Sequence, residues 1–99
     1  MLNITKKVEE KNAVLLLEGR LDTVTAPQLE ETLLAIYPQL SELTFDLEKL
    51  EYISSAGLRV LLSAQKVMTK QGAMQLVNVS ENVMEIFEVT GFSEILTIK

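Results

Sequence analysis

Two adjacent hydroxyl side chains, Ser54 and Ser55, stand directly before a long stretch with helical apolar periodicity. A serine in that place commonly caps the helix by accepting a backbone N–H. The same place favours negative charge, because the first N–H groups of a helix are unpaired and its dipole is positive there. A phosphate on either hydroxyl would fit locally while changing the surface by about −1.5 to −2 charges. Capping, anion binding and covalent modification are therefore three interpretations of this pair.

Gly57 follows in the first turn of the same expected helix. Glycine there is less favourable than alanine by up to about 1 kcal/mol, so a physical reason for it is expected. Close approach of another chain segment would supply that reason. The segment is either another element of the fold or the backbone of a partner.

Two aspartates, Asp22 and Asp46, are each expected to end a strand. An aspartate in that place commonly caps the turn that follows. Alternatively, two carboxylates at one edge could hold Mg²⁺ or activate a hydroxyl, as in a small enzyme or phosphoryl carrier of the response-regulator receiver type. The chain is shorter than a typical receiver and lacks that family's paired acidic residues after the first strand, so this hypothesis ranks below the others.

Composition narrows the possible functions further. The 99 residues contain no cysteine and no histidine, which removes disulfides, thiolate metal sites, and the commonest general base and metal ligand. A net charge of −5 disfavours a nucleic-acid surface. No apolar run approaches the roughly 20 residues of a membrane span, and the first residues do not resemble a signal peptide. We therefore expect a cytoplasmic protein with one domain over residues 1–99, without membrane or nucleic-acid contacts.

The elements that must position these residues follow from periodicity and helix-end signals. Alternation or short apolar runs predict strands over 3–9, 13–17, 43–47, 74–79 and 95–98, with 48–53 as a connector. The second strand is expected to be covered on both faces, and Gly19 to let it bend or end. Helical spacing predicts helices over 26–37, 55–70 and 80–89, with Thr25 capping the first and Gly72 and Gly91 ending the others.

This order, β-β-α-β-α-β-α-β, predicts a small α/β domain with helices packed against a mixed, mostly parallel sheet. The first strand is expected to be antiparallel to the second, because the turn between them is short. Segments 19–23 and 51–58 both reach the carboxyl edge of the strands, where ligands of open α/β sheets bind.

Several segments together resemble the STAS domain, specifically the bacterial anti-sigma-factor antagonists. The signature lies in Tyr52-Ile53-Ser54-Ser55-Ala56-Gly57-Leu58-Arg59-Val60-Leu61-Leu62. Glu18-Gly19-Arg20-Leu21-Asp22 resembles the second family motif, and Leu43-Thr44-Phe45-Asp46-Leu47 the third strand. Family members often carry Asp and a second hydroxyl where this chain has Ser54 and Ala56. The resemblance covers essentially the whole chain.

The resemblance implies a switch and not an enzyme. The unmodified antagonist would bind an anti-sigma factor that is also an ATP-dependent serine kinase. Phosphorylation at Ser55, with Ser54 as the alternative acceptor, would release that partner, and a serine/threonine phosphatase would restore binding. No cofactor or metal is implied.

The residues expected to contact the partner surround the acceptor serine: Asp22, Thr23, Val24, Thr25, Ser54, Ser55, Gly57 and Arg59. The alternative hypothesis is a STAS domain that meets no kinase and serves as an accessory subunit of a transporter or stress-signalling complex.

Overall fold

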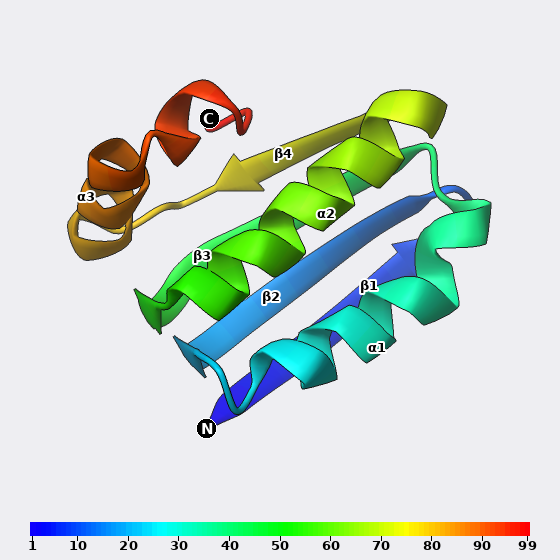
Figure 1. The fold of residues 1–99 in the computed structure, drawn as a ribbon. Coiled ribbons are helices and arrows are strands. Elements are labelled where there is room, and N and C mark those ends of the chain that lie inside the picture. Colours follow the sequence, from blue (N-terminus) through cyan, green and yellow to red (C-terminus); the bar gives the residue numbers. More distant parts are fainter.

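A computed structural model describes all residues, 1–99, as a four-stranded sheet covered by helices. The strands are β1 (Leu2–Glu9), β2 (Asn12–Leu21), β3 (Glu42–Ile53) and β4 (Ala73–Val77). The helices are α1 (Ala26–Ile36), α2 (Ser55–Gln71) and α3 (Glu81–Thr90), with 3₁₀ turns over Tyr37–Gln39 and Phe92–Glu94. The strands lie in the order β1-β2-β3-β4 (Figure 1). β1 is antiparallel to β2 and the other pairs are parallel, which confirms the predicted mixed α/β fold.

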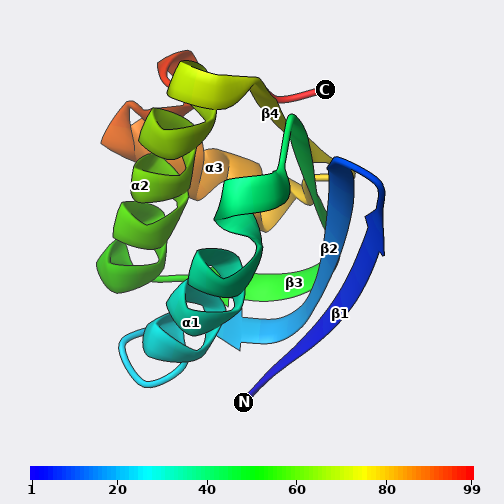
Figure 2. The same ribbon diagram turned by 90° about the vertical axis from the view of Figure 1, so that its right-hand side faces the viewer.

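All three helices lie on one face of the curved sheet, and the other face is not covered (Figure 2). The burial of β2 therefore alternates: Ala13, Leu15 and Leu17 are buried, whereas Val14 and Leu16 are only half-buried. The expectation that this strand is covered on both faces is wrong, because no helix crosses to the second face.

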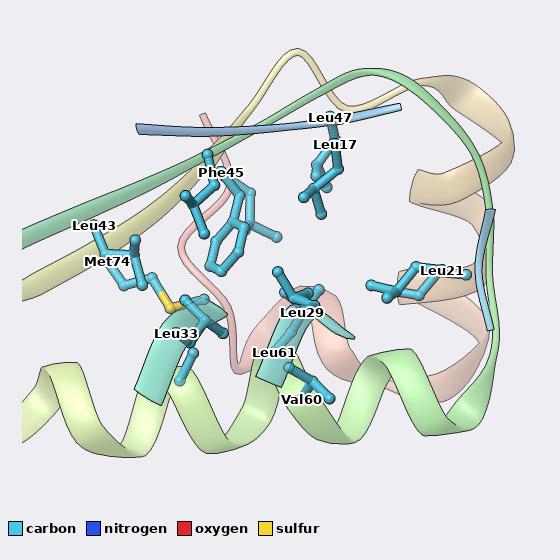
Figure 3. Close-up of a cluster of buried hydrophobic side chains, with 14 of the residues drawn as sticks. Leu17, Leu21, Leu29, Leu33, Leu43, Phe45, Leu47, Val60, Leu61 and Met74 are labelled. Atoms are coloured by element: carbon cyan, nitrogen blue, oxygen red, sulfur yellow. The ribbon is translucent and has the colours of Figure 1, made fainter. Parts of the chain in front are cut away.

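The core lies between this sheet and the helices. Inward side chains of β2 and β3 meet those of α1 and α2, and Leu17, Phe45, Leu29 and Leu61 lie near its centre (Figure 3). All four are fully buried. Buried side chains recur every two residues along the strands and every three or four along the helices, so each element turns one apolar face into this layer.

The helix ends agree closely with the predicted signals. Ser80 accepts a hydrogen bond from the backbone N–H of Val83 at the start of α3, and Gly91 ends this helix in the left-handed region at φ 83°. Gly72 follows α2, and its N–H donates to Met68. Thr25 precedes α1 as expected, but its hydroxyl makes no capping bond to that helix.

β3 departs from the prediction, because it continues through Ile53 where a connector was expected. Two register shifts against β2, between Leu16 and Glu18 and between Gly19 and Arg20, each leave one extra residue in β3. These bulges bend the strand and change its inward spacing from two residues to three. Of the two outcomes predicted for β2 at Gly19, ending is wrong: Gly19 has φ 107° and the strand continues to Leu21.

The last predicted strand is present only as one isolated bridge, in which Ile98 pairs in parallel with Leu76 of β4. The segment before it folds into the 3₁₀ turn Phe92–Glu94, so residues 95–97 do not extend the sheet. None of the three α-helices is both long enough and apolar enough to cross a bilayer.

Candidate functional site

The two segments singled out in the sequence meet at one corner of the molecule, where β2 and β3 end side by side (Figure 1). Leu21 and Ile53 form the last register pair of these strands. The N–H of Ser54 donates to the carbonyl of Leu21 at 2.9 Å, which fixes the start of α2 to the end of β2. The loop of residues 22–25 and the first turn of α2 therefore form one continuous surface.

The two serines occupy different positions on this surface. Ser54 is the residue before α2, and its Oγ accepts a hydrogen bond from the N–H of Gly57 at 3.4 Å. Ser55 is the first residue of the helix; its side chain is exposed and its hydroxyl has no hydrogen-bond partner. The capping interpretation thus applies to Ser54, and the free hydroxyl is that of Ser55.

Gly57 is buried beneath these serines. A Cβ at this position would lie 2.7 Å from Cγ of Leu21, 2.9 Å from Cγ1 of Ile53 and 3.0 Å from the carbonyl oxygen of Leu21. The close approach predicted from the sequence is therefore made by the fold itself, at the ends of β2 and β3. Glycine lets α2 begin directly against the strands, and this brings Ser55 beside the 22–25 loop.

The 22–25 loop is held by a reciprocal pair of side chains, Asp22 and Thr25. Oδ1 of Asp22 accepts the N–H groups of Val24 at 3.0 Å and Thr25 at 3.1 Å. The Thr25 hydroxyl accepts the N–H of Asp22 at 2.9 Å and donates to the carbonyl of Arg20 at 2.8 Å. The N–H of Thr25, above all, lowers the pKa of the Asp22 carboxyl, with further contributions from the Thr25 hydroxyl and the N–H of Val24.

The exposure of this loop is uneven. Thr25 is only 7% exposed and faces the interior, so it serves as an anchor. Val24 is 85% exposed, which leaves an apolar side chain at the loop tip. Thr23 is also exposed. The loop thus presents Thr23 and Val24 outward while Asp22 and Thr25 fix its shape.

An open groove of about 280 Å³ runs from this loop between α1 and α2. Arg59 and Glu30 are the charged residues of its lining, one from each helix. Both side chains are exposed, and neither takes part in an ion pair. The remaining lining is small or polar: Thr23, Ala26, Pro27, Ala56, Val60 and Ser63.

Sequence reasoning missed one feature, a stack of Arg20 on Tyr52. The guanidinium carbon of Arg20 lies 4.4 Å from the ring centroid of Tyr52. The Nε atom of Arg20 lies 3.9 Å from Oδ2 of Asp22. Arg20 and Tyr52 are register partners across β2 and β3. Their spacing along the chain carries no sign of this contact, because it depends on the bulged register of the strands.

Asp46 does not end a strand as predicted and does not join the site, so the alternative hypothesis of two carboxylates at one edge is wrong. It lies within β3 opposite Leu16, roughly 20 Å along the strands from Asp22 at the usual rise per residue. Its Oδ1 accepts the N–H of Glu48 at 3.1 Å and the side-chain amide of Asn78 at 3.2 Å. The structure contains no group of three acidic residues that could hold a metal ion.

A protein family and several known proteins are similar to this chain over nearly its whole length. The family model described as the STAS domain matches residues 3–99. The anti-sigma-B factor antagonist of Bacillus subtilis (strain 168) is 32% identical over 98 residues, which cover 98% of this chain and 90% of that protein.

Solved structures of anti-sigma factor antagonists have the same fold. The one from Mycobacterium paratuberculosis has a TM-score of 0.88 at 22% identity, covering 99% of this chain and 85% of that one. SpoIIAA matches in its unphosphorylated form, with TM-score 0.82, 19% identity and coverage of 100% and 88%. Its phosphorylated form, that of a Bacillus cell fate determinant, matches with TM-score 0.75, 18% identity and coverage of 100% and 91%.

Proposed function

Because the chain belongs to the STAS domain family, we propose that it is an anti-sigma-factor antagonist whose binding is controlled by phosphorylation of Ser55. In the unmodified form it binds an anti-sigma factor that is also a serine kinase. Phosphorylation by that partner releases it, and a serine/threonine phosphatase restores the binding form. The similarity to relatives named anti-sigma-B factor antagonists supports this proposal.

The observation that carries the proposal is the difference between the two serines. The Ser54 hydroxyl is occupied as the cap of α2, whereas the Ser55 hydroxyl is exposed and unbonded. A kinase can reach Ser55 without breaking a bond of the fold. The Ser54 hydroxyl is instead half-buried, and its oxygen is held against the N–H of Gly57.

The surface proposed for the partner is centred on Ser55. It includes Ser54 and Arg59 on α2, and Thr23 and Val24 on the loop. The exposed Val24 side chain supplies apolar area of the kind that the centre of an interface uses. Asp22 and Thr25 shape the loop from within, and Gly57 sets the depth at which α2 begins.

Mass mapping of the phosphorylated residue tests the proposal. The protein is incubated with candidate anti-sigma serine kinases and ATP, as wild type and as Ser55→Ala, Ser54→Ala and Ser63→Ala. We expect phosphate in the wild type, Ser54→Ala and Ser63→Ala, and none in Ser55→Ala. Ser63→Ala is the matched control, because Ser63 is an exposed serine on the same helix.

Two results would contradict the proposal. Phosphate that persists in Ser55→Ala and disappears in Ser54→Ala would make Ser54 the acceptor. If no candidate kinase modifies the chain, the accessory-subunit hypothesis becomes the better one. A pull-down with wild type and Ser55→Ala then checks whether a partner is bound without any dependence on Ser55.

A further inference from the structure

We propose that Arg59 binds the phosphate of phosphorylated Ser55 within the same chain, and that this contact is part of the switch. The inference rests on the proposed phosphorylation of Ser55. It concerns a contact inside the protein, so it can be tested without the partner.

The geometry of α2 places the two side chains together. Ser55 and Arg59 are four residues apart on one continuous helix and both are exposed. Residues at this spacing lie on the same face, with Cβ atoms about 5–6 Å apart. The guanidinium has a planar set of donors that matches phosphate oxygens. A phosphate on Ser55 is therefore within reach of Arg59.

Arg59 has no other ionic partner. The one ion pair of the chain joins Arg20 to Asp22, and Arg20 is also stacked on Tyr52. Glu30 lines the same α1–α2 groove as Arg59, and Asp22 lies in the loop that precedes α1. Glu30 forms no ion pair, and Asp22 is occupied by backbone N–H groups and Arg20. Arg59 is thus the cation available to a new anion at residue 55.

This contact would give phosphorylation two effects on the proposed partner surface. The phosphate adds negative charge at Ser55, and it also occupies the donors that Arg59 would otherwise offer to the partner. The surface would then change from a neutral hydroxyl beside a free cation to a closed ion pair with residual negative charge. The second effect requires Arg59 and would be lost in Arg59→Gln.

Phosphorus NMR of phosphoserine installed at residue 55 during translation tests the contact. The full chain is titrated between pH 4.5 and 8, as wild type, Arg59→Gln and Lys66→Gln, and the second pKa of the phosphate is read from its chemical shift. Lys66→Gln is the matched control. It removes the same charge from the same helix, at a site about 16 Å along the axis from residue 55 and beyond the screening length of ordinary buffer.

We expect the phosphate pKa of the wild type to lie below that of Arg59→Gln by roughly 0.3 pH unit, the size typical of helical charge pairs at this spacing. Lys66→Gln should match the wild type, and the difference should shrink in 1 M salt. Equal phosphate pKa values in wild type and Arg59→Gln would overturn the inference.

That negative result would leave the proposed function intact, because the phosphoserine is installed without a kinase. Conversely, if no kinase modifies Ser55 but the phosphate pKa differs as expected, the proposed function fails while the contact stands. Circular dichroism of each variant verifies that α2 is unchanged.

Discussion

At residue 57, only the hydrogen side chain of glycine leaves room for α2 to begin against the ends of β2 and β3. In Gly57→Ala the added methyl group would meet Leu21 and Ile53 at contact distances that real Cβ atoms do not show. Alanine gains up to about 1 kcal/mol of helix propensity, but overpacking of this kind costs about 1–3 kcal/mol. We expect the overpacking to outweigh the gain in propensity, with a net loss of up to about 2 kcal/mol in the free energy of unfolding.

Urea denaturation measures this loss, with Ser63→Ala as an exposed control on the same helix that should change stability by less than about 0.5 kcal/mol. A Gly57→Ala protein as stable as the wild type would show that the corner can relax around a methyl group. In that case the glycine would not be needed for packing.

Asp22 makes the site sensitive to acid, because its carboxylate accepts backbone N–H groups only in the folded protein. Its pKa is lowered on folding, chiefly by the N–H of Thr25. The carboxylate therefore adds stability above its unfolded pKa of about 3.9, and this stability is lost as the pH falls through the folded pKa. We expect the difference in unfolding free energy between wild type and Asp22→Asn to shrink between pH 6 and pH 2.5.

Urea denaturation at these two pH values tests the acid sensitivity. The control is Glu94→Gln, which measures the general effect of removing one negative charge, because Glu94 is exposed and far from Asp22 in the sequence. A difference between wild type and Asp22→Asn that stays constant over this range would contradict the role given to the carboxylate.

At the scale of elements, the 22–25 loop depends on the buried hydroxyl of Thr25 as well as on the carboxylate of Asp22. Thr25→Val keeps the shape of the side chain but leaves the N–H of Asp22 and the carbonyl of Arg20 without their partner. Unsatisfied groups of this kind cost about 1–3 kcal/mol each when buried. We expect Thr25→Val to lower the free energy of unfolding by about 1–3 kcal/mol in total for the two groups.

Hydrogen exchange localises the effect of Thr25→Val, since the amides of Asp22, Val24 and Thr25 should lose protection before those of the sheet. Thr23→Val is the matched control, because Thr23 is an exposed neighbour with no hydrogen bond from its hydroxyl. Equal stability of the two variants would show that the loop holds its shape without the Thr25 hydroxyl.

At the scale of the whole molecule, the proposed switch should change binding without unfolding the domain. Ser55 is exposed and lies outside the hydrophobic core, so a phosphate on it displaces no buried side chain. The interface must instead desolvate an added charge, and poorly paired buried charges at interfaces cost about 2–5 kcal/mol. That corresponds to roughly 30-fold to several-thousand-fold in affinity.

We therefore expect phosphorylation of Ser55 to weaken binding of the cognate anti-sigma kinase at least tenfold while the melting temperature stays nearly unchanged. Calorimetric titration and thermal melts of both forms measure the two quantities. Equal affinities would refute the switch, and a large fall in melting temperature would indicate that the phosphate acts by disrupting the fold.

Much of this architecture could be predicted from the sequence because its signals are local. The helix ends follow from residues next to each other in the chain, such as Ser54 before α2 and Gly91 after α3. The inward faces of the helices follow from spacings of three and four residues, which one helical turn determines. The segments 19–23 and 51–58 are predicted to reach one edge of the sheet, and they do meet where β2 and β3 end.

The features that could not be predicted depend on strand pairing, because pairing joins residues that are far apart in the chain. Leu47, Leu50 and Ile53 are all buried in β3 at a spacing of three, which a regular strand does not produce. Only pairing with β2 through two bulges turns them to the same face. From the sequence alone, residues 48–53 are predicted to form a connector. That pairing also separates Asp46 from Asp22, sets Arg20 on Tyr52, and brings Leu21 against Gly57.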